Sequence, residues 1–145
     1  MDKEKNRLES IGQLCEVVAQ LRGPGGCPWD RVQTHESLKP ACIEEGAEVS
    51  GGIAILGEAG RAEHRQEGLG ALLLQVVFHA QLAQEEGLFS LADVAEAAAA
   101  KMVRRHPHVF HEPMLADAGK PVTGWKQIKG LEMRGRAWEA AYLPH

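Results

Sequence analysis

The feature that most constrains the fold is an apolar stretch in the middle of the chain, from about Gln66 to Glu86. Its apolar side chains recur at steps of three and four residues, at Leu69, Leu72, Leu73, Val76, Ala80 and Ala83. This period is typical of an amphipathic helix, and Leu74, Val77 and Leu82 widen its apolar surface beyond a single stripe. We therefore expect this helix to be the most buried element of the fold.

The rest of the chain predicts helices and loops, and none of it predicts a strand. Apolar periodicity and start signals place further helices at about residues 5–22, 41–56 and 90–105, and a short basic one from about Trp125. Pro40 suits the start of the second helix, because its missing N–H has no partner in a first turn. Residues 111–124 predict a long loop. The predicted class is all-α, in one domain over residues 1–145 with its core at about 5–110.

Composition narrows the class of protein. The net charge of −4 argues against binding to duplex nucleic acid, where a basic patch would dominate affinity. Three cysteines without a Cys-x-x-Cys pair fit reduced thiols in a cytoplasmic protein better than disulfides or a zinc site. No stretch approaches the roughly 18 apolar residues that a membrane span needs. We expect a soluble, cytoplasmic protein without a membrane partner.

The segment Glu44-Glu45-Gly46-Ala47-Glu48 gathers three carboxylates within about a 100° arc of one helix. Clusters of oxygen ligands of this kind suit Mg²⁺ or Mn²⁺. The alternative is a solvated acidic face, which is common on surface helices. On the apolar helix, Glu67 is the only carboxylate of the first turn, and the positions that would continue an inward polar stripe are Gly68, Ala71 and Gln75.

Two basic pairs could face such an acidic cluster. Lys101 and Arg105 are four residues apart on one helix, and Trp125 and Lys129 share one face of the last helix. Lysine and arginine are the usual means of holding phosphate oxygens. Each pair alone also fits a solvated basic face. Together with the acidic cluster, however, they are what a metal-bound polyphosphate requires.

Three further residues have competing interpretations. Trp29, in a turn between a proline and an acid, is either a plug over the core or a flat surface near the base or ribose of a ligand. His79 fits a hydrogen-bonded core histidine better than a catalytic base. Cys42 has no lysine or histidine at local helical spacing to lower its pKa, so we interpret it as a packing residue.

Several segments closely resemble the MazG nucleoside triphosphate pyrophosphohydrolases, over about residues 10–130. They include Gly26-Cys27-Pro28-Trp29-Asp30, Glu44-Glu45-Gly46-Ala47-Glu48, Leu72-Leu73-Leu74-Gln75-Val76-Val77-Phe78-His79-Ala80-Gln81 and Arg104-Arg105-His106-Pro107-His108-Val109-Phe110. The resemblance implies an all-α, four-helix-bundle-like fold that forms homodimers or higher homo-oligomers. It also implies cleavage of nucleoside triphosphates to nucleoside monophosphates and pyrophosphate with Mg²⁺, or Mn²⁺, as the cofactor.

The resemblance also implies roles for individual residues. Glu44, Glu45 and Glu48 match the family's metal-binding Glu-Glu-x-x-Glu and so would be catalytic. Lys101 and Arg105 match its catalytic phosphate-binding positions, while Trp125 and Lys129 match its Trp-x-x-x-Lys near the nucleotide.

The second half of the family's metal site is missing from this chain. The Glu-x-x-Asp of the next helix corresponds to Gly68 and Ala71, and Gly51 stands where an acid is usual. This loss should weaken metal binding and leave the attacking water poorly activated. Glu67 lies about 40° from position 71 around the axis and could supply one ligand. The hypotheses are a working pyrophosphohydrolase of the MazG type, whose activity the missing acids could impair, a degenerate relative that binds nucleotide and turns it over slowly or not at all, and a plain helical interaction module.

Overall fold

The computed structural model describes residues 3–59, 62–110, 114–115, 121–122 and 124–142. Its elements are nearly all helices, which confirms the all-α class expected from the sequence. The chain divides into two compact units, residues 1–91 and 92–145, which are described separately below. Within the described ranges, no helix combines the length and the hydropathy that would be needed to cross a membrane.

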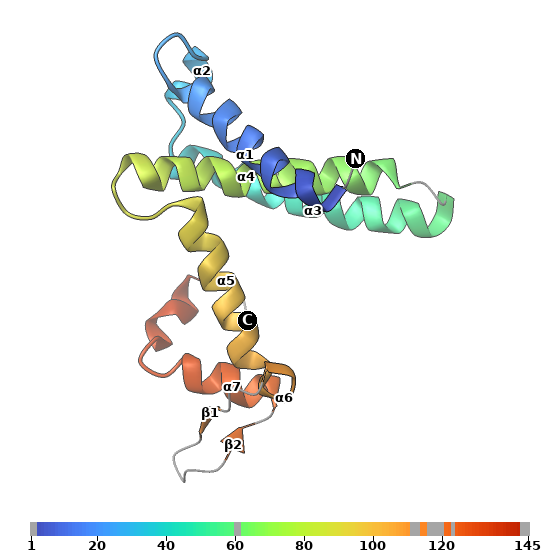
Figure 1. Cartoon of the computed structure of the whole chain (residues 1–145), viewed down its shortest axis with the longest axis vertical. Coiled ribbons are helices and arrows are strands. Elements are labelled where there is room, and N and C mark those ends of the chain that lie inside the picture. Colours follow the sequence, from blue (N-terminus) through green and yellow to red (C-terminus); the bar gives the residue numbers. More distant parts are fainter. Residues whose placement is uncertain (1–2, 60–61, 111–113, 116–120, 123, 143–145) are drawn as a thin grey trace. The chain divides into compact units, whose positions relative to one another are not determined.

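The first unit is built on a hairpin of two long helices (Figure 1). It contains α1 (Lys3–Arg22), α2 (Pro28–Arg31), α3 (His35–Ala59) and α4 (Glu63–Glu85). α3 and α4 lie side by side and antiparallel, and α1 packs across α4. The core joins α1 to the second half of α4 through Val18, Val77, Phe78 and Leu82.

α4 is the apolar helix predicted from the sequence, and among the described helices it contributes most of the buried residues. Burial is concentrated in its second half, from Val77 to Ala83. In its first half the apolar side chains stay accessible, and Leu69 is 51% exposed. The apolar surface predicted for this helix is therefore only partly covered within the chain.

Gly52 allows the backbones of α3 and α4 to approach closely. A Cβ atom on Gly52 would lie 3.1 Å from the carbonyl oxygen of His64 and 3.2 Å from the Cα of Arg65. Gly68 packs against Val49, where a Cβ would meet the Cα at 3.4 Å. The helical cost of a glycine at position 52, about 1 kcal/mol relative to alanine, is therefore offset by close packing of the hairpin.

The predicted start of α3 was wrong. The helix begins at His35, so Pro40 lies inside it and not at its first position. Reciprocal hydrogen bonds define the true start, because Thr34 N–H donates to Ser37 Oγ at 2.8 Å and Ser37 N–H donates to Thr34 Oγ1 at 3.1 Å. This arrangement resembles a capping box, with serine in place of the usual Glu or Gln. Pro40 then removes only one hydrogen bond, close to the helix start.

The Thr34 cap provides a test of this start. We expect Thr34→Ala to lower the free energy of unfolding by about 1 kcal/mol, because the Ser37 N–H loses its acceptor. Ser50→Ala is the matched control, since the Ser50 hydroxyl donates only to the carbonyl of Gly46 within the same helix. Urea denaturation of both variants measures the difference. Equal losses in the two variants would show that Thr34 does not cap α3.

The second unit contains shorter elements (Figure 1). They are α5 (Leu91–Arg105), α6 (Pro107–Phe110), β1 (Met114–Leu115), β2 (Pro121–Val122), α7 (Trp125–Glu132) and a 3-10 helix, η1 (Ala137–Ala141). The sequence correctly placed the ends of α5 and the start of α7. It did not predict the antiparallel pairing of β1 with β2, which spans two residues on each strand. Ile128 of α7 is fully buried.

Candidate functional site

A cleft of about 590 Å³ lies between α3 and α4 in the first unit. Its walls are formed by Glu45, Glu48, Gly51, Gly52 and Ile55 from α3, and by His64, Glu67, Gly68 and Ala71 from α4. The cleft therefore joins two of the three glutamates of the predicted acidic cluster to Glu67 of the facing helix. Glu44, the third member of the cluster, is exposed and is not part of the lining.

Among the residues that line the cleft, Glu45 has the least satisfied carboxylate. The side chain is partly buried, and its Oε2 atom is buried with no hydrogen-bond partner among the described residues. A buried carboxylate oxygen without a partner costs free energy that a bound cation would recover. Three carboxylates around one cleft form an oxygen-only donor set, which suits a hard divalent cation. The residues present therefore fit such an ion in their chemistry.

The carboxylates around the cleft do not converge on one point, as the ligands of a metal ion do. Among the residues that the structure describes, no three His, Cys, Asp or Glu side chains converge closely enough to hold a metal ion. Gly68 and Ala71, at the positions where the family resemblance leads us to expect acids, both line the cleft and offer it no donor. The α4 wall therefore contributes Glu67 as its one carboxylate among the lining residues.

In the second unit, Arg105 is already engaged by other side chains. Its Nη2 lies 2.7 Å from Glu132 Oε2, and its guanidinium carbon lies 4.7 Å from the ring centroid of Trp125. The side chains of Arg105 and Glu132 are only 11% and 9% exposed. Arg104 Nε pairs with the other oxygen of Glu132. Lys101 and Lys129 are exposed.

Glu132 is a charged residue that the sequence did not single out. Burial raises the pKa of its carboxyl, but hydrogen bonds from Arg105 and Arg104 outweigh burial, so that the pKa lies below its usual value. The carboxylate is therefore held in its charged form between two arginines. The sequence signal was weak, because Glu132 lies 27 residues from Arg105 and local spacing does not link them.

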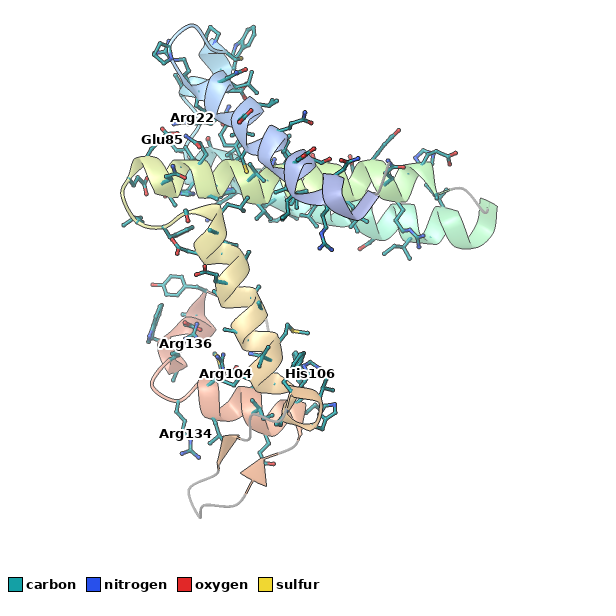
Figure 2. All side chains as sticks on the ribbon, in the orientation of Figure 1. Arg22, Glu85, Arg104, His106, Arg134 and Arg136 are labelled. Carbon is teal, nitrogen blue, oxygen red and sulfur yellow. The ribbon has the colours of Figure 1, made fainter. Side chains whose placement is uncertain are left out.

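Trp29 lies on α2 and is 77% exposed, which excludes its interpretation as a plug over the core. The turn that carries it is fixed by Arg22, whose Nη1 donates to the carbonyl oxygens of Asp30 at 2.5 Å and Gln33 at 3.2 Å. Arg22 also forms two hydrogen bonds with the carboxylate of Glu85, at 2.8 and 2.9 Å. Figure 2 shows Arg22 of α1 directed toward Glu85 at the end of α4.

Comparison with known proteins agrees with the resemblance seen in the sequence. The family profile of the MazG nucleotide pyrophosphohydrolase domain matches residues 33–110, which is more than half of the chain. The nucleoside triphosphate pyrophosphohydrolase/pyrophosphatase MazG of Thermotoga maritima is 45% identical over 120 residues, covering 83% of this chain and 44% of that protein. The nucleoside triphosphate pyrophosphohydrolase of Escherichia coli K12 is 40% identical over 135 residues, covering 92% of this chain and 50% of that protein.

A third relative, the uncharacterized protein YabN of Bacillus subtilis, is 41% identical over 130 residues, covering 90% of this chain and 26% of that protein. The chain thus spans half, or less, of the length of the relatives that it matches. The chain belongs to the MazG nucleotide pyrophosphohydrolase domain family.

Proposed function

We propose that this chain is a nucleoside triphosphate pyrophosphohydrolase of the MazG type, in which residues 1–145 act as one domain in the cytoplasm. The reaction would convert a nucleoside triphosphate to a nucleoside monophosphate and pyrophosphate. Its single strongest support within the structure is the cleft lined by Glu45, Glu48 and Glu67, together with the buried, unpartnered Oε2 of Glu45. MazG-family pyrophosphohydrolases use a divalent metal, and we propose Mg²⁺ or Mn²⁺ for this one.

Glu45, Glu48 and Glu67 would hold the metal, which when bound supplies charge neutralisation at the phosphates and activation of water. Glu44 lies outside the lining of the cleft, and we propose it as a further metal ligand on its match to the family's Glu-Glu-x-x-Glu. Lys101 and Arg105 would neutralise phosphate oxygens. Trp125, which is 41% exposed, would offer the base a free part of its ring, with Lys129 on the same helix. Exposed Trp29 remains a proposed surface for the base or ribose.

A second candidate function is nucleotide binding without efficient turnover. The observation that favours it is that Gly68 and Ala71 line the cleft without offering a donor. A metal held by fewer carboxylates binds more weakly and activates water less. Both candidates use the same residues, and they differ in whether the chemical step occurs.

We also propose that two copies of the chain associate through α4. Leu69, Leu73 and Val76 follow a helical spacing and remain exposed. Exposed apolar stripes of this kind commonly mark protein interfaces. The association of helices from two subunits agrees with the fold that the sequence resemblance implies.

The proposed function predicts metal-dependent release of pyrophosphate from nucleoside triphosphates. We expect Glu45→Gln to lower the rate at least about hundredfold, because the cleft loses a charged oxygen ligand. Glu36→Gln is the matched control, since Glu36 lies on the same helix outside the cleft and should leave the rate unchanged. Removal of divalent metal with EDTA should abolish release. Nucleotide binding without any release by the unmodified protein would instead support the second candidate.

A further inference from the structure

Outside the acidic cleft, the first unit holds a chain of hydrogen-bonding side chains that joins a thiol to two imidazoles. Cys42 Sγ lies 3.3 Å from His79 Nε2, and His79 Nδ1 lies 2.7 Å from His35 Nδ1. The outer nitrogen of His35, Nε2, lies 3.7 Å from Glu86 Oε2. The planes of the two imidazole rings lie 14° apart, with their centroids 5.0 Å apart. A nucleophile, a base and a third group that orients the base therefore lie in sequence.

Which imidazole donates in the hydrogen bond between His35 and His79 depends on where each ring carries its proton. Two neutral imidazole nitrogens at 2.7 Å share one proton, so one Nδ1 donates and the other accepts. We assign the proton of His35 to Nε2, on the side of the Glu86 carboxylate, which leaves His35 Nδ1 as the acceptor. His79 Nδ1 is then the donor, and His79 Nε2 has a free lone pair directed at the Cys42 thiol.

The surroundings keep His79 in this neutral state. Burial of the ring lowers the pKa of His79 below its usual value. A neutral imidazole is the form that can accept a proton from the thiol. The thiol has a second acceptor, Gln75 Oε1, at 3.6 Å, which is the longer of the two contacts. Cys42 thus has an imidazole partner that local helical spacing could not reveal, because His79 comes from the facing helix.

We propose that Cys42 is a nucleophilic thiol, with His79 as its base and His35 as the residue that positions His79, and that its ligand class is a low-molecular-weight disulfide. In the reaction, the sulfur of Cys42 attacks one sulfur of the disulfide while its proton passes to His79 Nε2. The new bond joins Cys42 to the attacked sulfur, and the original S–S bond breaks. The departing thiolate takes the proton from His79. Cys42 is oxidised to a mixed disulfide and the other half of the reagent is reduced to a thiol.

The other two cysteines provide an internal comparison. Cys15, Cys27 and Cys42 are all partly buried, so exposure alone does not distinguish them. Cys15 packs against the core of the first unit, and Cys27 precedes α2. Neither of them forms a hydrogen bond with a histidine within the described part of the chain. The proposal therefore requires that Cys42 react faster than both.

The test uses the full chain and 2-hydroxyethyl disulfide at one neutral pH in metal-free buffer, with peptide mass mapping of each cysteine over time. We expect Cys42 to react at least about tenfold faster than Cys15 or Cys27. His79→Gln should lower the Cys42 rate at least about tenfold and leave the other two rates unchanged. His35→Leu should lower the Cys42 rate by a smaller factor.

A fall in the Cys42 rate indicates loss of the base, whereas a rise indicates damage to the fold. A variant that merely loosens the packing of α3 on α4 would expose Cys42 and raise its rate, and it would also alter Cys15. The proposal would be overturned if Cys42 reacted no faster than Cys15 and Cys27 in the unmodified protein. It would also be overturned if the Cys42 rate in His79→Gln stayed the same or rose.

Discussion

The double variant Gly68→Glu, Ala71→Asp is expected to release pyrophosphate from nucleoside triphosphates at least about hundredfold faster than the unmodified chain. Both positions line the cleft that already contains Glu45, Glu48 and Glu67. The substitutions would therefore place two further oxygen ligands opposite the acids of α3. A metal held by more carboxylates is bound more tightly and orients its substrate better.

The packing at Gly68 permits this change. A Cβ atom there would lie 3.4 Å from the Cα of Val49, 3.5 Å from its Cγ2 and 3.6 Å from the carbonyl oxygen of Glu48, all ordinary van der Waals distances. The φ angle of Gly68 is not in the left-handed region that requires glycine. Replacing a helical glycine also removes its conformational cost. The variant should therefore fold, and its activity can be compared directly.

Gly70→Glu is the matched control for the added charge. Gly70 lies on the same helix, a Cβ added there would meet nothing within 4 Å, and it is not part of the cleft lining. Rates are measured by pyrophosphate release with Mg²⁺ and with Mn²⁺. An unmodified chain that is already as active as the double variant would show that the acids at 68 and 71 are not needed. An equal gain in Gly70→Glu would point to a general effect of charge.

Replacement of Arg22 is expected to have the largest effect on stability. Arg22→Met should lower the free energy of unfolding of the first unit by about 2–4 kcal/mol. The Arg22 side chain is only 10% exposed, and it donates to two backbone carbonyls as well as to Glu85. Methionine fills a similar volume but leaves the carbonyls of Asp30 and Gln33 without this donor. Urea denaturation measures the loss.

Two companion variants separate the parts of this interaction. Glu85 is 40% exposed, so Glu85→Gln should cost less than about 1 kcal/mol. Arg22→Lys keeps the charge but cannot reproduce the planar set of donors, and it should behave more like methionine than like arginine. If Glu85→Gln were as destabilising as Arg22→Met, the carbonyl contacts would not be the main contribution.

The ion pair of Arg22 with Glu85 also makes part of the free energy of unfolding depend on pH. The hydrogen bond from Arg22 is the main reason that the pKa of Glu85 lies below its usual value. Its contribution is therefore complete above the usual pKa of a glutamate and is lost as the pH falls through the lowered value. Arg22→Met should remove this acid-dependent part.

The sequence predicted most of the helices because periodicity is a local property. The spacing of Leu69, Leu72 and Val76 indicated α4, and Pro107 correctly ended α5. Pro40 misled the prediction of α3, because a proline just inside a helix and one at its start look alike when the Thr34 cap is unknown. The short pairing of β1 with β2 had no detectable signal in two residues per strand.

The candidate site was predicted unevenly for the same reason. The acids at 45, 48 and 67 could be identified from their positions on two helices, and the structure places them around one cleft. Contacts between distant residues were invisible, because no spacing rule relates Glu132 to Arg105 or His79 to Cys42. No local pattern indicated that Gly52 lets the backbones of α3 and α4 meet.

The carboxylate of Glu132 has a consequence for which anions the second unit can accept. A phosphate that is to bind the Nε and Nη2 donors of Arg105 in the proposed reaction must displace an anion that is tethered to the same unit and held between two arginines. A tethered group competes at a high effective concentration, whatever the concentration of free anions in solution. Singly charged competitors such as chloride would rarely succeed, while a polyphosphate carries enough charge to do so. Competition from Glu132 would then restrict binding at Arg105 to ligands of high charge density.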